Sequence, residues 1–218
     1  MNIRVFALCA VVLASLFWAA AETINFSQLT VKPYGSQEFD ISTGITTLPE
    51  GGDVIDTDTN LALSGSFVRF EDGAFIEATD VTITGDFGTL AAAEVFLDLG
   101  SSTLDIPSKL TFRRAELELT AGAMKYHHGQ GIAVFTGGVQ GSVPPLTADT
   151  LLLDSLAGVM LLVGRYSFTD GLFTLESPES GGRLYVAIEV DEETGTTDYI
   201  ATSNPGEAEL ERFAPFLE

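Results

Sequence analysis

The most informative pattern for the fold lies in the segment Leu146-Thr147-Ala148-Asp149-Thr150-Leu151-Leu152-Leu153-Asp154. Its apolar residues follow the spacing apolar-x-Ala-x-x-apolar-x-apolar, so the first pair has one parity and the second pair has the other. Successive side chains of a β-strand point to opposite faces, and a flat strand therefore could not bury both pairs on one side. The pattern predicts a bulge or corner near Asp149-Thr150 that keeps one face of the strand inside.

The same spacing recurs in three other segments. They are Ile76-x-Ala78-x-x-Val81-x-Ile83, Leu90-x-Ala92-x-x-Val95-x-Leu97 and Leu119-x-Ala121-x-x-Met124-x-Tyr126. Each copy predicts a bulge where its parity changes, near Thr79-Asp80, Ala93-Glu94 and Gly122-Ala123. Chance is the alternative explanation for any single copy, because Leu, Val and Ala are abundant in the chain. Strands that bend in this way are typical of a curled sheet or jelly roll rather than a flat sandwich.

Alternating, strand-like runs fill the rest of the chain between Glu22 and Val190. In the run Ala115–Ala121, for example, apolar residues alternate with Glu116, Glu118 and Thr120. Most of the 22 glycines stand between such runs, as turn signals do. The sequence therefore predicts an all-β fold, a curled antiparallel β-jellyroll with bulged strands, over residues 22–190.

The first residues of the chain are typical of a secretory signal peptide. Arg4 supplies a positive start, Val5–Trp18 is an unbroken run of apolar and small residues, and Ala19-Ala20-Ala21 offers small residues at a cleavage site. We predict a signal peptide over residues 1–21, cleaved after Ala21. The alternative is an uncleaved membrane anchor, but the run is roughly 14 residues long and a spanning helix needs about 20.

The last residues, 191–218, hold eight acidic residues and one basic residue, Arg212. This composition predicts a solvated acidic tail rather than part of the core. Within it, the spacing of Leu210 and Phe213 after Glu207 predicts one short C-terminal helix that ends before Pro215.

Charge and cysteine content exclude several classes of function. The 218 residues include 31 acidic and 10 basic residues, giving a net charge of −21 and a pI near 4.1. Such a surface repels a phosphate backbone, so we predict no nucleic-acid partner. The single cysteine, Cys9, lies in the predicted signal peptide, which leaves the mature chain without a disulfide or a cysteine-based zinc site.

Two stretches resemble the OstA-like family of β-jellyroll proteins, which includes periplasmic lipopolysaccharide-transport proteins of the LptA and LptC kind. In Val134–Asp154, the turn Gly137-Gly138-Val139 leads to a Leu-x-Ala strand that ends in Asp. Leu90–Asp98 repeats the second half of that pattern, a Leu-x-Ala strand that ends in Asp. The resemblance covers about residues 60–190.

The resemblance implies an open jelly roll whose apolar interior holds acyl chains and whose ends pair edge to edge with neighbours. The residues it places on the lipid lining are Ile76, Ala78, Val81, Ile83, Leu90, Ala92, Val95, Leu97, Leu119, Leu151 and Leu153. The alternative is that these residues fill a closed core, since both arrangements need the same inward alternation.

Arg113 and Arg114 are the only adjacent basic residues of the mature chain. They stand where the alternation slips, so a bulge there could aim both side chains outward and form an anion contact. The alternative is an ordinary surface pair facing the acidic excess.

No catalytic or metal-binding pattern stands out. His127 and His128 lack a third ligand at a defined spacing, and we predict a turn-exposed pair rather than a triad or a zinc site. Asp53, Asp56, Asp58 and Asn60 are spaced like the start of a calcium-binding loop, but the sharp-turn glycine and the bidentate glutamate are missing. An irregular calcium site there is the alternative to a solvated turn. We predict no enzyme activity, no cofactor and no metal.

These observations predict an exported protein of the periplasm or cell envelope that binds or relays an amphipathic lipid or glycolipid. The alternative from another class is a structural envelope protein that pairs through edge strands or binds polysaccharide and carries no lipid. A secreted glycan-active enzyme ranks behind both, because no spacing selects a pair of carboxylates.

Overall fold

The computed structural model describes residues 29–56, 60–190 and 197–217. The predicted signal peptide lies outside the described residues. The first strands are β1 (Leu29–Pro33), β2 (Glu38–Asp40), β3 (Ile45–Leu48), β4 (Gly52–Asp56), β5 (Leu61–Gly65), β6 (Phe67–Glu71), β7 (Phe75–Gly85), β8 (Gly88–Asp98) and β9 (Thr103–Ile106). They are followed by β10 (Leu110–Arg114), β11 (Leu117–Ala121), β12 (Ala123–His127), β13 (Ile132–Val143), β14 (Pro145–Asp154), β15 (Val159–Asp170), β16 (Phe173–Ser177), β17 (Arg183–Val190) and β18 (Thr197–Thr202).

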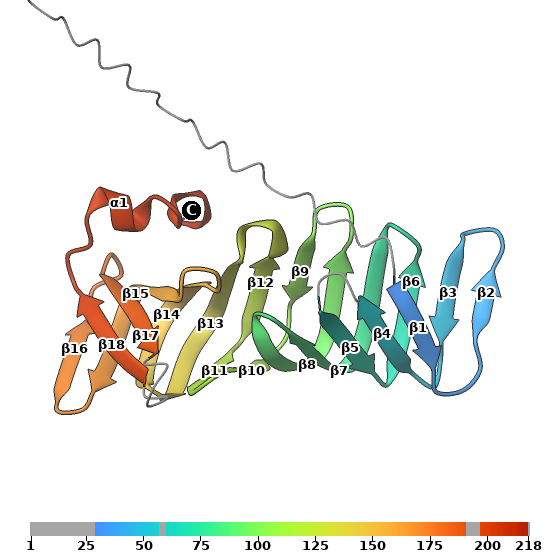
Figure 1. Ribbon diagram of the computed structural model, residues 1–218, viewed down its shortest axis with the longest axis horizontal. Helices are drawn as coiled ribbons and strands as arrows, with labels where there is room; N and C mark the ends of the chain where they lie inside the picture. The colour runs from blue at the N-terminus through green and yellow to red at the C-terminus, as the bar shows by residue number, and fades with distance from the viewer. Residues whose placement is uncertain (1–28, 57–59, 191–196, 218) are drawn as a thin grey trace, which may run out of the picture.

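The strands follow one another along the long axis of the molecule, from β1–β3 at one end to β16–β18 at the other (Figure 1). All strand pairings among the described residues are antiparallel, and hairpins such as β7–β8 and β13–β14 connect neighbours. Among the described residues, β1 and β2 pair only with β4 and β3, and β16 and β18 pair only with β15 and β17. Each end of the molecule therefore presents free strand edges.

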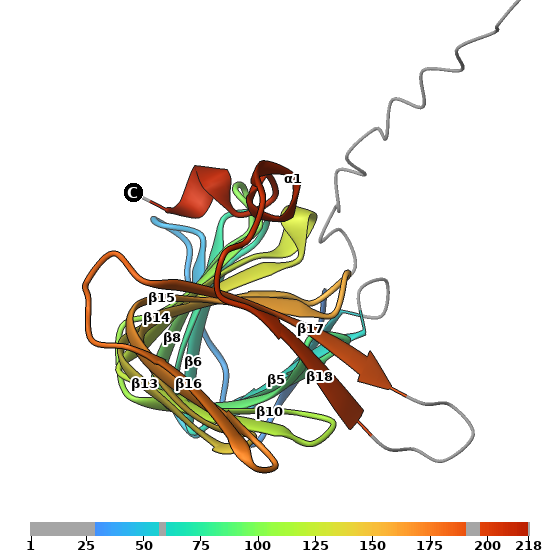
Figure 2. The same cartoon turned by 90° about the vertical axis from the view of Figure 1, so that its left-hand side faces the viewer.

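The 18 strands form one hydrogen-bonded sheet that folds over into two layers. Sheet I contains β1, β4, β5, β10, β11 and β16, and sheet II contains β2, β3, β6, β9, β12, β17 and β18. The long strands β7, β8, β13, β14 and β15 belong to both, because one half of each pairs in sheet I and the other half in sheet II. The view along the long axis shows the two layers meeting along one side, which we call the corner (Figure 2).

The corner lies where the parity of the apolar residues changes, as predicted. Asp149 drops out of pairing at a register shift between Ala148 and Thr150, and Gly122 separates β11 from β12. At Asp80 and Ala93 the β7–β8 ladder loses one pair but keeps its register, so the feature there is a kink rather than the predicted bulge. Asp80 has φ 47°, a left-handed conformation that reverses the inward face within one residue.

The inner faces of the two sheets enclose one apolar core. Phe112 from sheet I packs on Phe135 from sheet II with ring centroids 5.2 Å apart. The core continues along the molecule from Leu48 and Val54 to Leu184 and Val186. The prediction of an all-β, curled antiparallel jelly roll is confirmed.

Beyond β18 the chain returns across the outer face of sheet II (Figure 2). We call residues 207–217, which contain α1 (Glu207–Leu210) and the short helix η2 (Ala214–Phe216), the strap. The short C-terminal helix is confirmed, but it ends earlier than predicted, and Pro215 lies inside η2. β18 extends the roll past residue 190, into the stretch that composition assigned to the tail.

The strap is not a solvated tail. Phe213 is 1% exposed and packs in a second apolar cluster with Ile132, Leu152 and Leu161. These three side chains point away from the main core, so β13, β14 and β15 are covered on both faces. Double coverage explains the unbroken apolar runs Leu151-Leu152-Leu153 and Val159–Val163.

Substitutions at two adjacent glycines can test the geometry of the corner. Gly137 and Gly138 have φ values of 79° and 81°, but an added Cβ at Gly137 would lie 3.0 Å from the Gly122 Cα, whereas nothing lies within 4 Å of one at Gly138. We predict that Gly138→Ala lowers the free energy of unfolding by about 1–2 kcal/mol through backbone strain alone. Gly137→Ala should cost more, because it adds a backbone clash. Urea unfolding of both variants measures the difference, and equal losses would contradict this account of the corner.

Candidate functional site

The predicted lipid-lining residues all face the interior, but they do not line an open groove. Val81, Ile83, Leu90, Leu97, Leu119 and Leu151, for example, are at most 2% exposed, and Ala92 is the one half-buried member of the set. Their side chains pack in the main core. Over this length of the roll the geometry is that of a filled core.

The side opposite the corner, which we call the mouth, is bridged by contacts between the two sheets. Phe87, in the β7–β8 turn, packs on Tyr126 of β12 with ring centroids 5.0 Å apart. Arg114, at the end of β10, donates an Nη2 hydrogen bond of 2.6 Å to the carbonyl oxygen of Ser155 in the β14–β15 turn. These contacts hold the free ends of sheets I and II together.

Arg113 and Arg114 do not form a shared anion site. Arg113 lies on the outer face, where its Nε and Nη2 donate to Glu118 Oε1 at 2.9 and 2.6 Å, and this contact lowers the pKa of Glu118. Arg114 lies on the other side and points across the mouth. The expected bulge is instead a hairpin turn at Ala115, which has φ 49°. Strand alternation therefore separates the two guanidinium groups.

One cavity lies between the sheets near the C-terminal end, with a volume of about 110 Å³. We call it the mouth cavity. Sheet I contributes Leu117 and the turn before it, and sheet II contributes Leu153 of β14, Gly158, and Ile188, Thr197 and Tyr199 of β17 and β18. Leu153 is the one predicted lining residue that borders it. Leu117 stands in the predicted strand run Ala115–Ala121 but precedes the repeated pattern that begins at Leu119. Ile188 and Tyr199 come from β17 and β18, which no copy of the repeated pattern covers.

Among the polar residues that border the mouth cavity are Arg114, Glu116 and Tyr199. The Tyr199 hydroxyl is buried and has no hydrogen-bond partner among the described residues. Burial raises the pKa of this hydroxyl, and Glu116 and Asp170 raise it further, so it stays a neutral donor. A buried hydroxyl without a partner is unusual in a folded protein, and a ligand oxygen could accept a hydrogen bond from it.

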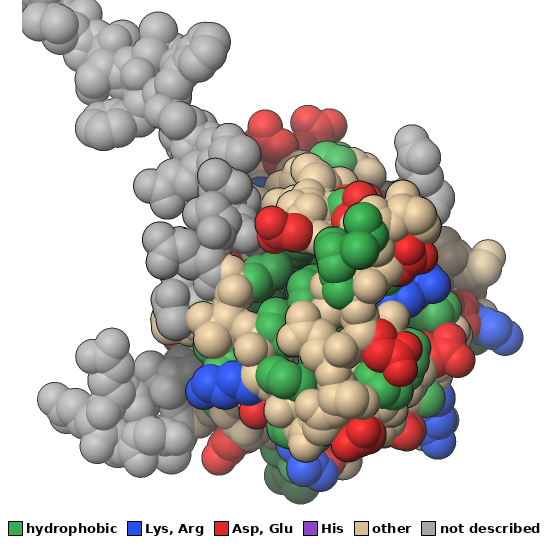
Figure 3. Space-filling view, turned by 90° about the vertical axis from the view of Figure 1, so that its right-hand side faces the viewer, with side chains coloured by type: hydrophobic (Ala, Val, Ile, Leu, Met, Phe, Trp, Pro, Cys, Tyr) green, Lys and Arg blue, Asp and Glu red, His purple; other side chains and the backbone are tan. Residues whose placement is uncertain are grey.

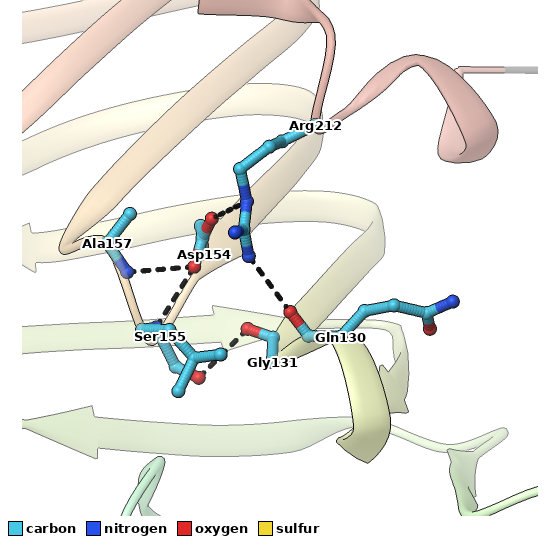
Figure 4. Close-up of polar contacts among 7 residues, drawn as sticks. Gln130, Gly131, Asp154, Ser155, Ala157 and Arg212 are labelled. Atoms are coloured by element: carbon cyan, nitrogen blue, oxygen red, sulfur yellow. Dashed lines mark hydrogen bonds and ion pairs between the residues drawn. The ribbon is translucent and has the colours of Figure 1, made fainter. Parts of the chain in front are cut away.

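Asp154 organises the turn at the rim of the mouth cavity (Figure 4). Its carboxylate is fully buried, and Oδ1 accepts hydrogen bonds from the backbone N–H groups of Leu156 and Ala157 at 3.0 and 2.9 Å. Its Oδ2 forms an ion pair of 2.5 Å with Nε of Arg212, which reaches it from the strap. In the sequence, Asp154 stands out only as the end of its strand, because its ion-pair partner is 58 residues away in the chain.

The remaining polar candidates do not assemble. His127 packs on Phe216 of the strap and His128 on Tyr126, so both are half-buried rather than turn-exposed, and burial lowers the pKa of each. Asp53 and Asp56 lie on opposite faces of β4, and Asp58 lies outside the described residues. Within the described part of the chain, no group of three His, Cys, Asp or Glu side chains could hold a metal ion.

Both ends of the roll expose large apolar side chains beside their free edges. Phe39 is 60% exposed and Ile41 88% exposed near β2, and Leu172 and Phe173 are 98% and 80% exposed at β16. The end that carries β1–β3 shows hydrophobic side chains among acidic ones (Figure 3). Apolar exposure at a free edge is typical of a pairing surface.

Of three comparisons with known proteins, only the one with solved structures found similar chains. No protein-family model and no curated protein sequence matches the chain. Among solved structures the chain is similar to LptH from Pseudomonas aeruginosa, described as the LptA-homologous periplasmic component of the lipopolysaccharide transport device, at 12% identity and a TM-score of 0.28. The alignment covers 81% of this chain and 96% of that one. The described residues contain no helix long and apolar enough to span a membrane.

Substitutions at two adjacent residues of β7 can test whether the core is filled. Ile83 is fully buried, whereas its neighbour Thr82 points outward and is exposed. We predict that Ile83→Asp lowers the free energy of unfolding by at least about 4 kcal/mol, because an unpaired carboxylate would enter an apolar interior. Thr82→Asp should cost far less. Thermal melts of the two variants measure this, and a stably folded Ile83→Asp protein would indicate a hydrated groove instead.

Proposed function

We propose that this protein is a non-enzymatic, exported component of the cell envelope that binds and relays an amphipathic lipid. The mouth cavity carries the proposal, since Leu117, Leu153 and Ile188 give it apolar walls and the polar residues Arg114 and Tyr199 also border it. This is the composition of a ligand site, in which apolar walls supply affinity and few polar groups orient the ligand. The resemblance of Val134–Asp154 to OstA-like sequences agrees with it.

The size of the mouth cavity limits what enters. A cavity of about 150 Å³ in another protein core holds one benzene molecule, and the mouth cavity measures about 110 Å³. In the proposal, the end of one acyl chain enters and the head group stays at the rim. Arg114 uses one N–H group on Ser155 and keeps other donors for a carboxylate or phosphate oxygen.

The free edges supply the relay in this proposal. β1 and β2 at one end, and β16 and β18 at the other, would pair with like domains or with envelope proteins. The exposed apolar residues beside these edges favour such pairing. The same observation supports the second candidate function, a structural envelope protein that pairs through its edges and carries no lipid.

Binding of cis-parinaric acid, a fluorescent fatty acid, and of the corresponding alcohol tests the lipid site. We predict that both probes bind the purified protein with a gain in fluorescence. Ile188→Trp should abolish binding of both, because Ile188 faces the mouth cavity and the larger side chain fills it. Arg114→Gln should weaken binding of the acid by about tenfold and leave the alcohol nearly unchanged, because a charge-assisted hydrogen bond is lost.

The matched control is Glu189→Trp, which adds the same side chain at the exposed neighbour of Ile188 on β17. It should bind both probes as the parent protein does. A parent protein that binds neither probe, and that carries no lipid by mass spectrometry after purification from the envelope, would reject the lipid site in favour of the structural function.

Export is a separate part of the proposal. Cleavage after Ala21 predicts that the protein recovered from the periplasm begins at Glu22. Intact-mass spectrometry measures this directly. A mass that includes residues 1–21 would favour the uncleaved anchor.

A further inference from the structure

The strap reaches the mouth cavity through a continuous series of polar contacts. On the outer side of sheet II, Arg212 pairs with Asp154 at 2.5 Å and donates a second hydrogen bond of 3.1 Å to the carbonyl oxygen of Gln130. Asp154 holds the N–H groups of Leu156 and Ala157, so its carboxylate fixes the β14–β15 turn (Figure 4). The strap therefore contacts the turn that forms one rim of the mouth.

The same turn holds Arg114 from the opposite sheet. Ser155 accepts the 2.6 Å hydrogen bond from Arg114 on its carbonyl oxygen, while its own N–H and Oγ both donate to Gly131 at 2.8 Å. At the far side of the turn, the carbonyl oxygen of Gly158 accepts from the N–H of Ile188 at 2.9 Å. Arg114, Gly158 and Ile188 all border the mouth cavity.

Charge makes Arg212 the critical member of this series. Asp154 is fully buried, and in the described part of the chain its only ion pair is with Arg212. A buried carboxylate that loses its counter-ion must draw in water or become protonated, and either change disturbs the turn that it holds. Phe213, the next residue, is 1% exposed and anchors the strap in the second apolar cluster.

We infer that the strap is a positioning element for the mouth cavity: Arg212 neutralises Asp154, Asp154 sets the β14–β15 turn, and the turn places Arg114 for an anionic head group. The inference rests on the proposed lipid site for its function. Its structural part, that Arg212 sets the turn, is independent of any ligand. Release of the strap would loosen the rim of the mouth while the corner keeps the two sheets joined.

Hydrogen exchange of the turn tests the structural part. In Arg212→Gln, the amides of Leu156, Ala157 and Ile188 should exchange about tenfold faster or more, while the amide of Ile83 in the core is unchanged. Asp154→Asn added to Arg212→Gln should restore much of the protection, because the buried charge is removed and the amide oxygen still accepts from the turn. Phe213→Ala should act like Arg212→Gln, because it releases the strap without changing charge.

Probe binding tests the functional part. Arg212→Gln should lower the preference for cis-parinaric acid over the alcohol by about tenfold, as Arg114→Gln does, although Arg212 does not border the mouth cavity. A merely structural role would weaken both probes equally. The matched control is Arg165→Gln, which breaks the exposed ion pair with Asp149 and should change neither readout.

The outcomes separate the two proposals. Turn amides that exchange equally in Arg212→Gln and Arg165→Gln would overturn the strap inference. So would an equal loss of both probes. Failure of the parent protein to bind either probe would reject the lipid site and the positioning role with it, while faster exchange of the turn would still show that Arg212 sets the β14–β15 turn.

Discussion

The whole structure depends on the reversal of the inward face where each long strand crosses the corner. Residues of one parity fill the interior in sheet I, and residues of the other parity fill it in sheet II. A left-handed residue at Asp80, two left-handed glycines at Gly137 and Gly138, and a register shift at Asp149 make this reversal. Without it, half of each strand would turn its apolar side chains to solvent.

The two sheets are held together differently at the corner and at the mouth. Backbone pairing continues through the corner, but at the mouth the sheets are linked by side chains and turns, such as Phe87 with Tyr126 and Arg114 with Ser155. Most of the interior is filled, and space remains near the C-terminal end. The strap acts on this end, because its apolar cluster and its ion pair both contact β14 and the turn after it.

Electrostatics support a site of this kind in a strongly acidic protein. With a net charge of −21, the surface disfavours the approach of an anion. Arg114 is partly buried between the sheets, and salt screens the distant surface charges more than the charges beside the mouth cavity. Of those nearby charges, Arg114 attracts an anion and Glu116 opposes it. A head group held there by Arg114 and Tyr199 would leave its acyl chain in apolar surroundings, which is the arrangement that an amphipathic ligand needs.

The strands, their curl and the places where they bend could be predicted from the amino-acid sequence, because alternation and parity are local properties of the chain. The three-dimensional packing settles whether the interior is filled or open, since both arrangements need the same inward residues. It also separated Arg113 from Arg114 and brought Arg212 to Asp154, a contact between distant parts of the chain. The burial of Phe213 could not be predicted from composition, because acidic residues dominate the tail around it. Its packing depends on residues of β13, β14 and β15 that are distant in the sequence.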